Sequence, residues 1–160
     1  MSHIELRSIS KQDFDLVRHI QVPPDQALYS GTILQAFRTP EQDVDFHAIY
    51  TDNNAVGFFK IDRNFGAKND FAIDGEVGLR AFMIDTLQQG KGYGVAAARA
   101  LHSYLPRHYS MAPSIVLTVN LANPVAYACY RKAGFIDTCD LYTGGIAGPQ
   151  HIMRMELHAE

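Results

Sequence analysis

The sequence predicts one α/β domain of the α+β kind, with about seven strands and about four helices. Apolar and β-branched runs typical of strands alternate with amphipathic, helix-like segments along the chain. No internal repeat, low-complexity tract or linker divides the 160 residues. Hydrophobic residues make up 47% of the chain, which is enough to bury a core of useful size.

The first half of the chain is expected to form three strands and two helices. In order, we predict a strand at 3–9, helices at 10–20 and 25–37, strands at 46–51 and 55–61, and a long polar connection at 64–74. Gly31 weakens the second helix, because glycine loses more conformational freedom than other residues when it becomes helical. The polar turn at 52–54 indicates a hairpin between the two later strands.

The second half alternates strands and helices more regularly. We predict a strand at 76–84, a helix from about 93 to 105, a buried strand at 114–119, a helix at 124–133, and final strands at 135–142 and 151–157. The third helix carries alanine and leucine at three- and four-residue spacing, so one face can pack closely on a sheet. Pro106 is expected to end it.

A glycine-rich segment at residues 87–94 connects the central strand to the third helix. Gly90, Gly92 and Gly94 alternate with larger residues, so the backbone can turn its N–H groups inward beside the positive end of the helix dipole. Such a loop is suited to a phosphate. Lys91 is followed by glycine rather than serine or threonine, which disfavours a P-loop. The Gly-x-Gly-x-Gly spacing, without an acidic residue about twenty positions downstream, disfavours a dinucleotide fingerprint.

A second informative segment covers residues 119–135. Asn123 can cap the fourth helix, Pro124 suits the first helical position, and Gly134 can adopt the left-handed conformation that ends it. Within this helix, Tyr130 precedes the Gly134-Phe135 pair by four residues.

Together these two segments resemble the GCN5-related N-acetyltransferase (GNAT) superfamily. Gln89, Gly92 and Gly94 fit its Gln-x-x-Gly-x-Gly loop, and the segment from Asn123 to Phe135 is similar to its second signature. The resemblance spans residues 76–135 and implies a GNAT fold, in which a central mixed, mostly antiparallel sheet is splayed in the middle. It also implies acetyl-CoA as co-substrate, bound through its pyrophosphate at the glycine loop.

The resemblance assigns the site residue by residue. The expected cofactor-binding residues are Phe82, Met83, Ile84, Gln89, Gly90, Lys91, Gly92, Tyr93, Gly94, Asn123 and Tyr130. Tyr130 is the expected catalytic acid at the leaving sulfur, whereas an aromatic residue here could instead pack in the core. Asn123 is expected either to contact the pantetheine arm or to act as the helix N-cap, and the two roles are compatible.

The second predicted catalytic residue is Glu76, as the base that deprotonates the amine. In one branch of the family the matching position is Gly78, so Glu76 departs from the pattern. By strand alternation Glu76 could instead pair with Arg80. His151 has a pKa range suited to a base but is more often a packing or surface residue, and water alone could carry the proton.

The composition of the chain argues against nucleic acid and membranes as binding partners. The net charge of −3 gives no basic surface for nucleic acid, and no apolar stretch is long enough to cross a membrane. We therefore expect a cytoplasmic protein in which Cys129 and Cys139 are reduced, without a structural metal because its histidines and cysteines lack metal-binding spacing. A homodimer is possible on general grounds.

The predicted function is therefore an enzyme, an N-acetyltransferase that moves an acetyl group from acetyl-CoA to a primary amine by direct transfer in a ternary complex. The acceptor is expected to be a small molecule, with a diamine or polyamine as one possibility. The alternative is a coenzyme A-binding sensor or interaction module without turnover. Release of free thiol in the presence of amines would distinguish the two.

Overall fold

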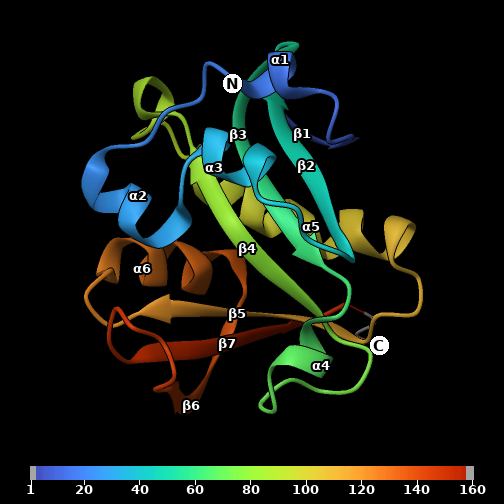
Figure 1. Cartoon of the computed structure of the whole chain (residues 1–160), viewed down its shortest axis with the longest axis vertical. Helices are drawn as coiled ribbons and strands as arrows, with labels where there is room; N and C mark the ends of the chain where they lie inside the picture. The colour runs from blue at the N-terminus through green and yellow to red at the C-terminus, as the bar shows by residue number, and fades with distance from the viewer. Residues whose placement is uncertain (1–2, 158–160) are drawn as a thin grey trace.

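A seven-stranded mixed sheet runs through the protein (Figure 1), in a computed structural model that describes residues 3–157. The strands are β1 Ile4–Ile9, β2 Val44–Thr51, β3 Asn54–Asp62, β4 Val77–Ile84, β5 Ser114–Asn120, β6 Ile136–Tyr142 and β7 Gln150–Glu156. Their order is β1-β2-β3-β4-β5-β7-β6, and neighbours pair antiparallel except for the parallel pair β4 and β5. The predicted mixed, mostly antiparallel sheet is confirmed.

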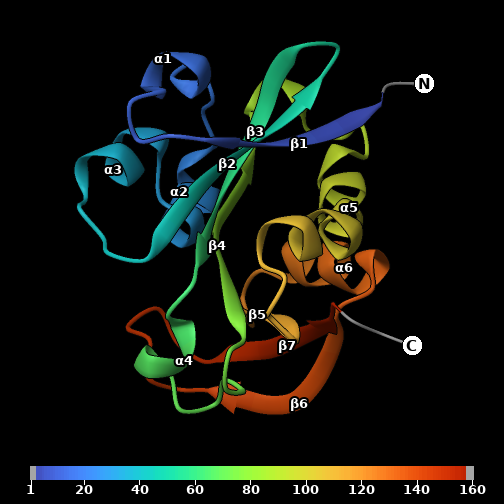
Figure 2. The same cartoon turned by 90° about the vertical axis from the view of Figure 1, so that its right-hand side faces the viewer.

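Helices cover both faces of this sheet. They are α1 Phe14–Val17, α2 Pro24–Ser30, α3 Ile33–Arg38, α4 Phe65–Lys68, α5 Tyr93–His108 and α6 Pro124–Ala133, with a short 3-10 helix, η1, at Thr86–Gln88. Figure 2 shows α1 to α3 on one side of the sheet and α5 with α6 on the other. Within residues 3–157, no helix combines the length and apolar character needed to cross a membrane.

The structure differs from the prediction mainly in helix boundaries. The helix expected at 25–37 is two helices, because Gly31 has φ 74° and ψ −169° and Thr32 then starts α3 with a capping box to Gln35. The connection expected at 64–74 contains the short helix α4. Pro106 does not end α5, which continues to His108. The first helix is reduced to the four residues of α1.

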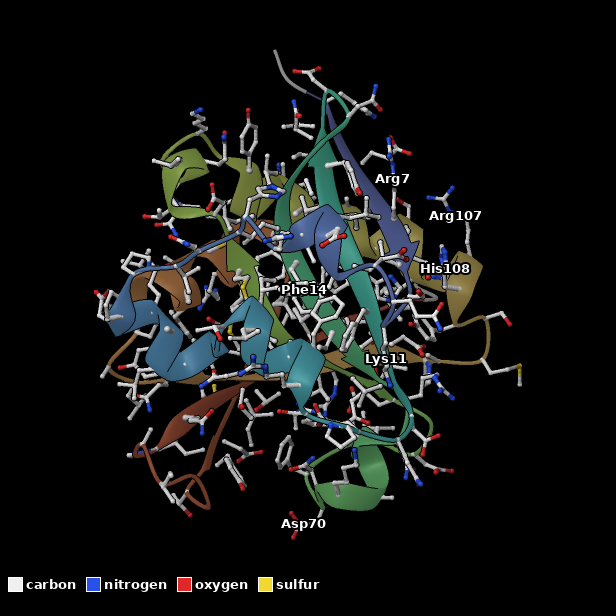
Figure 3. The ribbon with its side chains drawn as sticks, turned by 45° about the horizontal axis from the view of Figure 1, so that its top comes forward. Arg7, Lys11, Phe14, Asp70, Arg107 and His108 are labelled. Carbon is white, nitrogen blue, oxygen red and sulfur yellow. The ribbon has the colours of Figure 1, made fainter. Side chains whose placement is uncertain are left out.

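Each helical layer has its own core. Alanine and leucine side chains of α5, including Ala97, Leu101 and Leu105, are fully buried against the sheet. On the opposite face the core is aromatic, with Phe37 and Phe46 in an edge-on contact whose ring centroids are 4.8 Å apart. Phe14 of α1, labelled in Figure 3, extends this stack by packing edge-on against Phe37. The small α5 residues therefore bring that helix close to the strands that carry the site.

A buried polar chain joins β2 to the end of α5. The His47 ring lies 2.7 Å from the Tyr104 hydroxyl through Nδ1 and 2.8 Å from the Tyr109 hydroxyl through Nε2. Tyr109 donates its only hydroxyl proton to Asp45, so it accepts from Nε2–H, and Nδ1 of the neutral ring accepts from Tyr104. Burial, with a smaller contribution from the nearby His108 and against the opposing charge of Asp45, lowers the pKa of His47 to about 4.

We predict that this histidine makes the protein less stable as the pH falls from about 6.5 towards 4. The unfolded chain takes up a proton near pH 6.5, whereas buried His47 does not until about pH 4. The free energy of unfolding should therefore fall by about 2 kcal/mol between pH 7.5 and 5, as measured by urea titration. His47→Gln should remove this part of the pH dependence, and the exposed control His102→Gln should keep it. Equal pH dependence in His47→Gln and wild type would contradict the assignment.

Candidate active site

The central feature of the site is the parting of β4 and β5. These strands pair at only two positions, Val77 with Ile115 and Gly78 with Val116. Beyond that point their ribbons diverge (Figure 1). The edge of β4 that faces β5 is therefore unpaired from residue 79 onward, and its backbone amides are available to an extended ligand.

A β-bulge accompanies this parting. On β3, Lys60 pairs with Arg80 and Phe58 pairs with Met83, so Ala81 and Phe82 together face one β3 residue. Ala81 has a φ of 55°, which is left-handed backbone. Bulges bend a strand, and this one lies just beyond the last residues that pair with β5. Phe82, Met83 and Ile84, the predicted pantetheine partners, follow directly on the open edge.

The glycine loop lies between the end of β4 and the start of α5. Gly90 and Gly92 have φ values of 79° and 83°, and a Cβ at either position would meet nothing within 4 Å. Gly92 is the N-cap of the 16-residue α5, and no side chain caps that helix. The positive dipole end of α5 thus lies beside the exposed Gly90 and Gly92, which suits the pyrophosphate of coenzyme A.

The other predicted residues of the glycine loop, Gln89, Lys91 and Gly94, contact neighbouring parts of the protein. The Gln89 amide donates to the carbonyl of Ile84 (2.9 Å) and to Oε1 of Gln26 on α2 (2.8 Å), and it accepts from Nε2 of Gln26 (3.1 Å). Lys91 Nζ donates to Gln88 within the same loop. Gly94 lies against α6, since a Cβ there would be 3.5 Å from the Cys129 sulfur. Gln26, which the sequence analysis missed, therefore ties α2 to the loop.

Tyr130 of α6 lies at the open end of the sheet. Its ring packs against Phe82 of β4 and Phe135, with centroids 5.8 and 5.6 Å apart, and the residue is buried. Burial raises the pKa of Tyr130, so the side chain is a neutral phenol at pH 7. The left-handed Gly134 ends α6 as expected. Phe82 and Tyr130, which are far apart in sequence, therefore meet on the open β4 edge.

Tyr93 and Asn123 border the same region from two helix starts. Tyr93 is the first residue of α5 and packs, half-buried, against the core on the α5 side. Asn123 occupies the N-cap position of α6, but its side chain makes no capping hydrogen bond. The capping role expected for that side chain is thus not present, and its amide is left for another partner at the head of α6.

Glu76 lies at the other, closed end of the parting. Its carboxylate accepts from Arg154 Nε at 2.5 Å, from the Ser114 hydroxyl at 2.6 Å and from the Ile73 N–H at 2.9 Å. The residue is 1% exposed. Phe82 lies six positions further along the chain, which is roughly 20 Å in a strand. This geometry does not fit the predicted catalytic base, and the ion-pair partner of Glu76 is Arg154 rather than Arg80.

Gly78 stands at the position where the resemblance to one branch of the family would place a glutamate, and the structure leaves no room for a side chain there. A Cβ at this position would lie 2.2 Å from Cδ1 of Phe65, the first residue of α4. The Phe65 ring is buried and belongs to a small core with Val116 and Ile152. The space that a glutamate would occupy is therefore filled by α4, the helix that the sequence analysis did not predict.

Arg80 instead belongs to a charge network on the face that carries α4. Its Nη1 lies 2.6 Å from Oε2 of Glu41 and 3.4 Å from Oδ2 of Asp62. Lys60 donates to Glu41 at 2.7 Å. Burial alone would raise the Glu41 pKa, but the hydrogen bonds from Lys60 and Arg80 outweigh it and lower this pKa to about 2. Glu41 is therefore a firmly ionised structural partner.

His151 lies on the opposite face of the sheet from this network. Its ring packs against Tyr127 of α6 at a tilt, with centroids 4.3 Å apart, and its Nδ1 is 3.6 Å from Asp137. Tyr127 also donates to Asp137 at 2.7 Å. The structure thus places His151 in a packed cluster under α6. Among residues 3–157, no group of acidic, histidine or cysteine side chains could hold a metal ion, and Cys129 and Cys139 are free thiols.

An open β4 edge, a glycine loop at an uncapped helix start and a buried tyrosine beside them define the class of protein, an acyltransferase that uses a coenzyme A thioester. The model of the acetyltransferase (GNAT) family matches residues 5–135, and the chain belongs to that family. The predicted fold class, family and enzyme class are thereby confirmed. Among curated proteins, none matches this chain in sequence.

Solved structures with the same fold include aminoglycoside and polyamine acetyltransferases. The aminoglycoside acetyltransferase AAC(6')-Ib with coenzyme A has a TM-score of 0.77 and 20% identity, covering 96% of this chain and 95% of that chain. Spermidine N-acetyltransferase from Vibrio cholerae, in complex with CoA and spermine, has a TM-score of 0.69 and 16% identity, covering 96% and 95%. At these identities the likeness establishes the shared fold.

We predict that Gly78→Ala destabilises the protein by about 1–3 kcal/mol, because the new methyl group must displace the buried Phe65 ring. The free energy of unfolding in urea measures this. The matched control is Gly66→Ala on α4, where a Cβ would have its nearest neighbour at 3.7 Å and stability should hold. Equal free energies of unfolding for the two variants would show that α4 can move away from residue 78 without loss of stability.

We also predict that Gln26→Ala weakens the use of acetyl-CoA without abolishing turnover. The change removes two amide hydrogen bonds to Gln89, together worth about 1–3 kcal/mol. Because they hold the loop rather than contact the co-substrate, about half of this should be lost from binding, and the KM for acetyl-CoA should rise about threefold to tenfold. Steady-state kinetics at varied acetyl-CoA, with the exposed Gln12→Ala as control, measures the effect. An unchanged KM would mean that α2 does not support the loop.

Proposed function

We propose that the protein is an N-acetyltransferase that moves the acetyl group of acetyl-CoA directly to a primary amine of a small molecule. The observation that carries the proposal is the convergence of three features on one edge of β4: the open strand, the glycine loop at the start of α5, and Tyr130. Each feature matches one part of the co-substrate, namely the pantetheine amides, the pyrophosphate and the thioester sulfur.

The residues present fit acetyl-CoA. The backbone at Gly90 and Gly92 borders open space, since a Cβ at either position would meet nothing within 4 Å. A side chain there would take up part of that space. We assign the pyrophosphate to these N–H groups and to the start of α5, and the pantetheine amides to the edge of Phe82, Met83 and Ile84. Asn123, whose amide makes no cap, is suited to the same arm. When bound, the co-substrate supplies an activated acetyl group.

Tyr130 is the proposed acid for the departing thiolate. An ordinary phenol has a pKa near 10 and a thiol near 8.5, so full proton transfer in water is uphill by roughly 2 kcal/mol. The burial that raises the pKa of Tyr130 would also raise that of a sulfur held in the same apolar surroundings. Proton donation therefore depends on a dry contact between the two, which the packing of Tyr130 against Phe82 favours.

We propose that water carries the proton of the amine. An alkylamine with a pKa near 10.4 costs about 4–5 kcal/mol to neutralise at pH 7, so a route for its proton is needed. Glu76 is bound at the closed end of the sheet, and Glu41 is a weak base because its pKa is about 2. Neither of these two carboxylates suits the task, whereas an open parting between strands gives water access.

Cellular context and assembly complete the proposal. The net charge of −3 is consistent with a small-molecule substrate rather than nucleic acid, and we retain a cytoplasmic location and a possible homodimer as expectations. The alternative function is a coenzyme A-binding sensor. A buried tyrosine at the open edge favours the enzyme, because a sensor has no need of an acid beside the thioester.

We predict that Tyr130→Phe lowers kcat for a reactive amine about 100-fold while the KM for acetyl-CoA stays near that of the wild type. The substitution removes the acidic proton and keeps the aromatic packing with Phe82 and Phe135. Thiol release across a range of pH measures it. The control is Tyr127→Phe on the same helix, which should stay within a few-fold of wild type. Unchanged turnover in Tyr130→Phe at every pH would remove the acid role, and binding of acetyl-CoA without thiol release by wild type would favour the sensor.

A further inference from the structure

A cavity of about 300 Å³ lies where β4 and β5 part, on the face of the sheet that carries α4. Leu79 and Arg80 of β4 border it on one side and Thr118 of β5 on the other. Thr118 alternates with the core residues Leu117 and Val119, so it points away from the face that holds Tyr130. The cavity and Tyr130 thus lie on opposite sides of the parting, and a thioester held in that parting could be reached from both.

The charges around this cavity leave a positive excess. Three cations, Lys60, Lys68 and Arg80, share two carboxylates, Glu41 and Asp62. The carboxylates are already well supplied with donors, because Asp62 also accepts from the Asn64 N–H and Glu41 binds both Lys60 and Arg80. Lys68 and Arg80 line the cavity together with Glu41 and Asp62, and Lys60 donates to Glu41 from outside the lining. The network as a whole therefore carries a formal charge of one positive.

Lys68 and Arg80 have more N–H donors than they use in their hydrogen bonds to Glu41 and Asp62. Lys68 Nζ makes one hydrogen bond, to Asp62, and its side chain is 45% exposed. Among the contacts of the described residues, Arg80 reaches carboxylates only through Nη1, and its side chain is 35% exposed. A lysine has three donors and an arginine five, so both can still bind an anionic group.

Within residues 3–157, Glu41 and Asp62 are the only carboxylates that line the cavity. Asp70 follows α4, but Figure 3 shows its side chain at the outer edge of the molecule, pointing into solvent. Asp43 and Asp45 do not line the cavity; they share Arg63, and Asp45 also accepts from Tyr109. Lys11, labelled in the same figure, adds another cation beside Glu41 by donating to its backbone carbonyl.

We infer that the amine acceptor carries a carboxylate or phosphate group, which Arg80 and Lys68 bind while its amine points towards the parting of β4 and β5. The inference rests on the proposed function and names its acceptor class. Arg80 precedes Phe82 by two residues, about 7 Å along the strand, so a short chain can separate the anionic group from the amine. A polyamine would instead bring several positive charges next to Lys68 and Arg80, whose partner carboxylates are already occupied, and electrostatic complementarity disfavours it.

The test compares acceptors that differ only in the anionic group. Lysine, lysinamide and cadaverine share one amine-bearing chain, and phosphoethanolamine is compared with ethanolamine to distinguish a phosphate from a carboxylate preference. Thiol release from acetyl-CoA gives kcat/KM, and mass spectrometry identifies the acetylated product. We expect the anionic member of at least one set to exceed its uncharged or cationic counterparts at least tenfold.

Substitutions of Lys68 test whether this residue binds the anionic group of the acceptor. Lys68→Gln should reduce the preference for the anionic acceptor about fivefold or more, and Lys68→Arg should restore it. Arg18→Gln, which removes an exposed pair with Asp15 at the end of α1, should leave the preference unchanged. Lys68 is exposed, so these variants are expected to fold.

The outcomes separate the inference from the function on which it rests. If cadaverine or spermidine is used better than the anionic amines, the inference is overturned while the acetyltransferase stands. If the preference is present but Lys68→Gln does not change it, this cavity is not where the anion binds. If acetyl-CoA binds and no amine releases thiol, the proposed function fails, and the inference fails with it.

Discussion

The site depends on one constraint, which is that β4 and β5 can pair at only two positions. A regular parallel pair would satisfy the β4 edge along its length and leave no backbone amide for a ligand. The bulge at Ala81 bends β4 just beyond the last pair, at the cost of a non-glycine residue in left-handed backbone. The unpaired edge, the approach of Tyr130 to Phe82 and the cavity beside Arg80 all follow from this local break in the sheet.

The remaining architecture holds the two halves of the sheet on either side of the break. On the closed side, the buried Glu76 carboxylate joins three segments through Arg154, Ser114 and the Ile73 backbone. A buried ion pair of this kind is a poor source of net stability but strongly disfavours alternative arrangements, since either partner left alone would be an unpaired buried charge. The ion pair of Glu76 and Arg154 lies next to the last paired residues of β4 and β5, so it is placed to fix where these strands separate.

The sequence was most informative where local chemistry decides structure. Gly92, Gly134 and Pro124 mark their helix ends by backbone preference alone, so both ends of α6 and the start of α5 were predictable. Tertiary contacts decided the rest. The partner of Glu76 is 78 positions away in β7, and nothing near Glu76 indicates Arg154. Helix α4 was missed because four residues carry no periodic signal, and it is held by the packing of Phe65 over Gly78.

The amide pair between Gln26 and Gln89 has a consequence for how the two halves of the site respond to their surroundings. Both partners are uncharged and neither titrates, so the anchoring of the glycine loop to α2 is insensitive to salt and to proton concentration. The cavity proposed for the acceptor is lined by the ionised groups Glu41, Asp62, Lys68 and Arg80, whose fields are screened by dissolved ions. Dissolved salt should therefore change the proposed acceptor cavity more than the anchoring of the glycine loop.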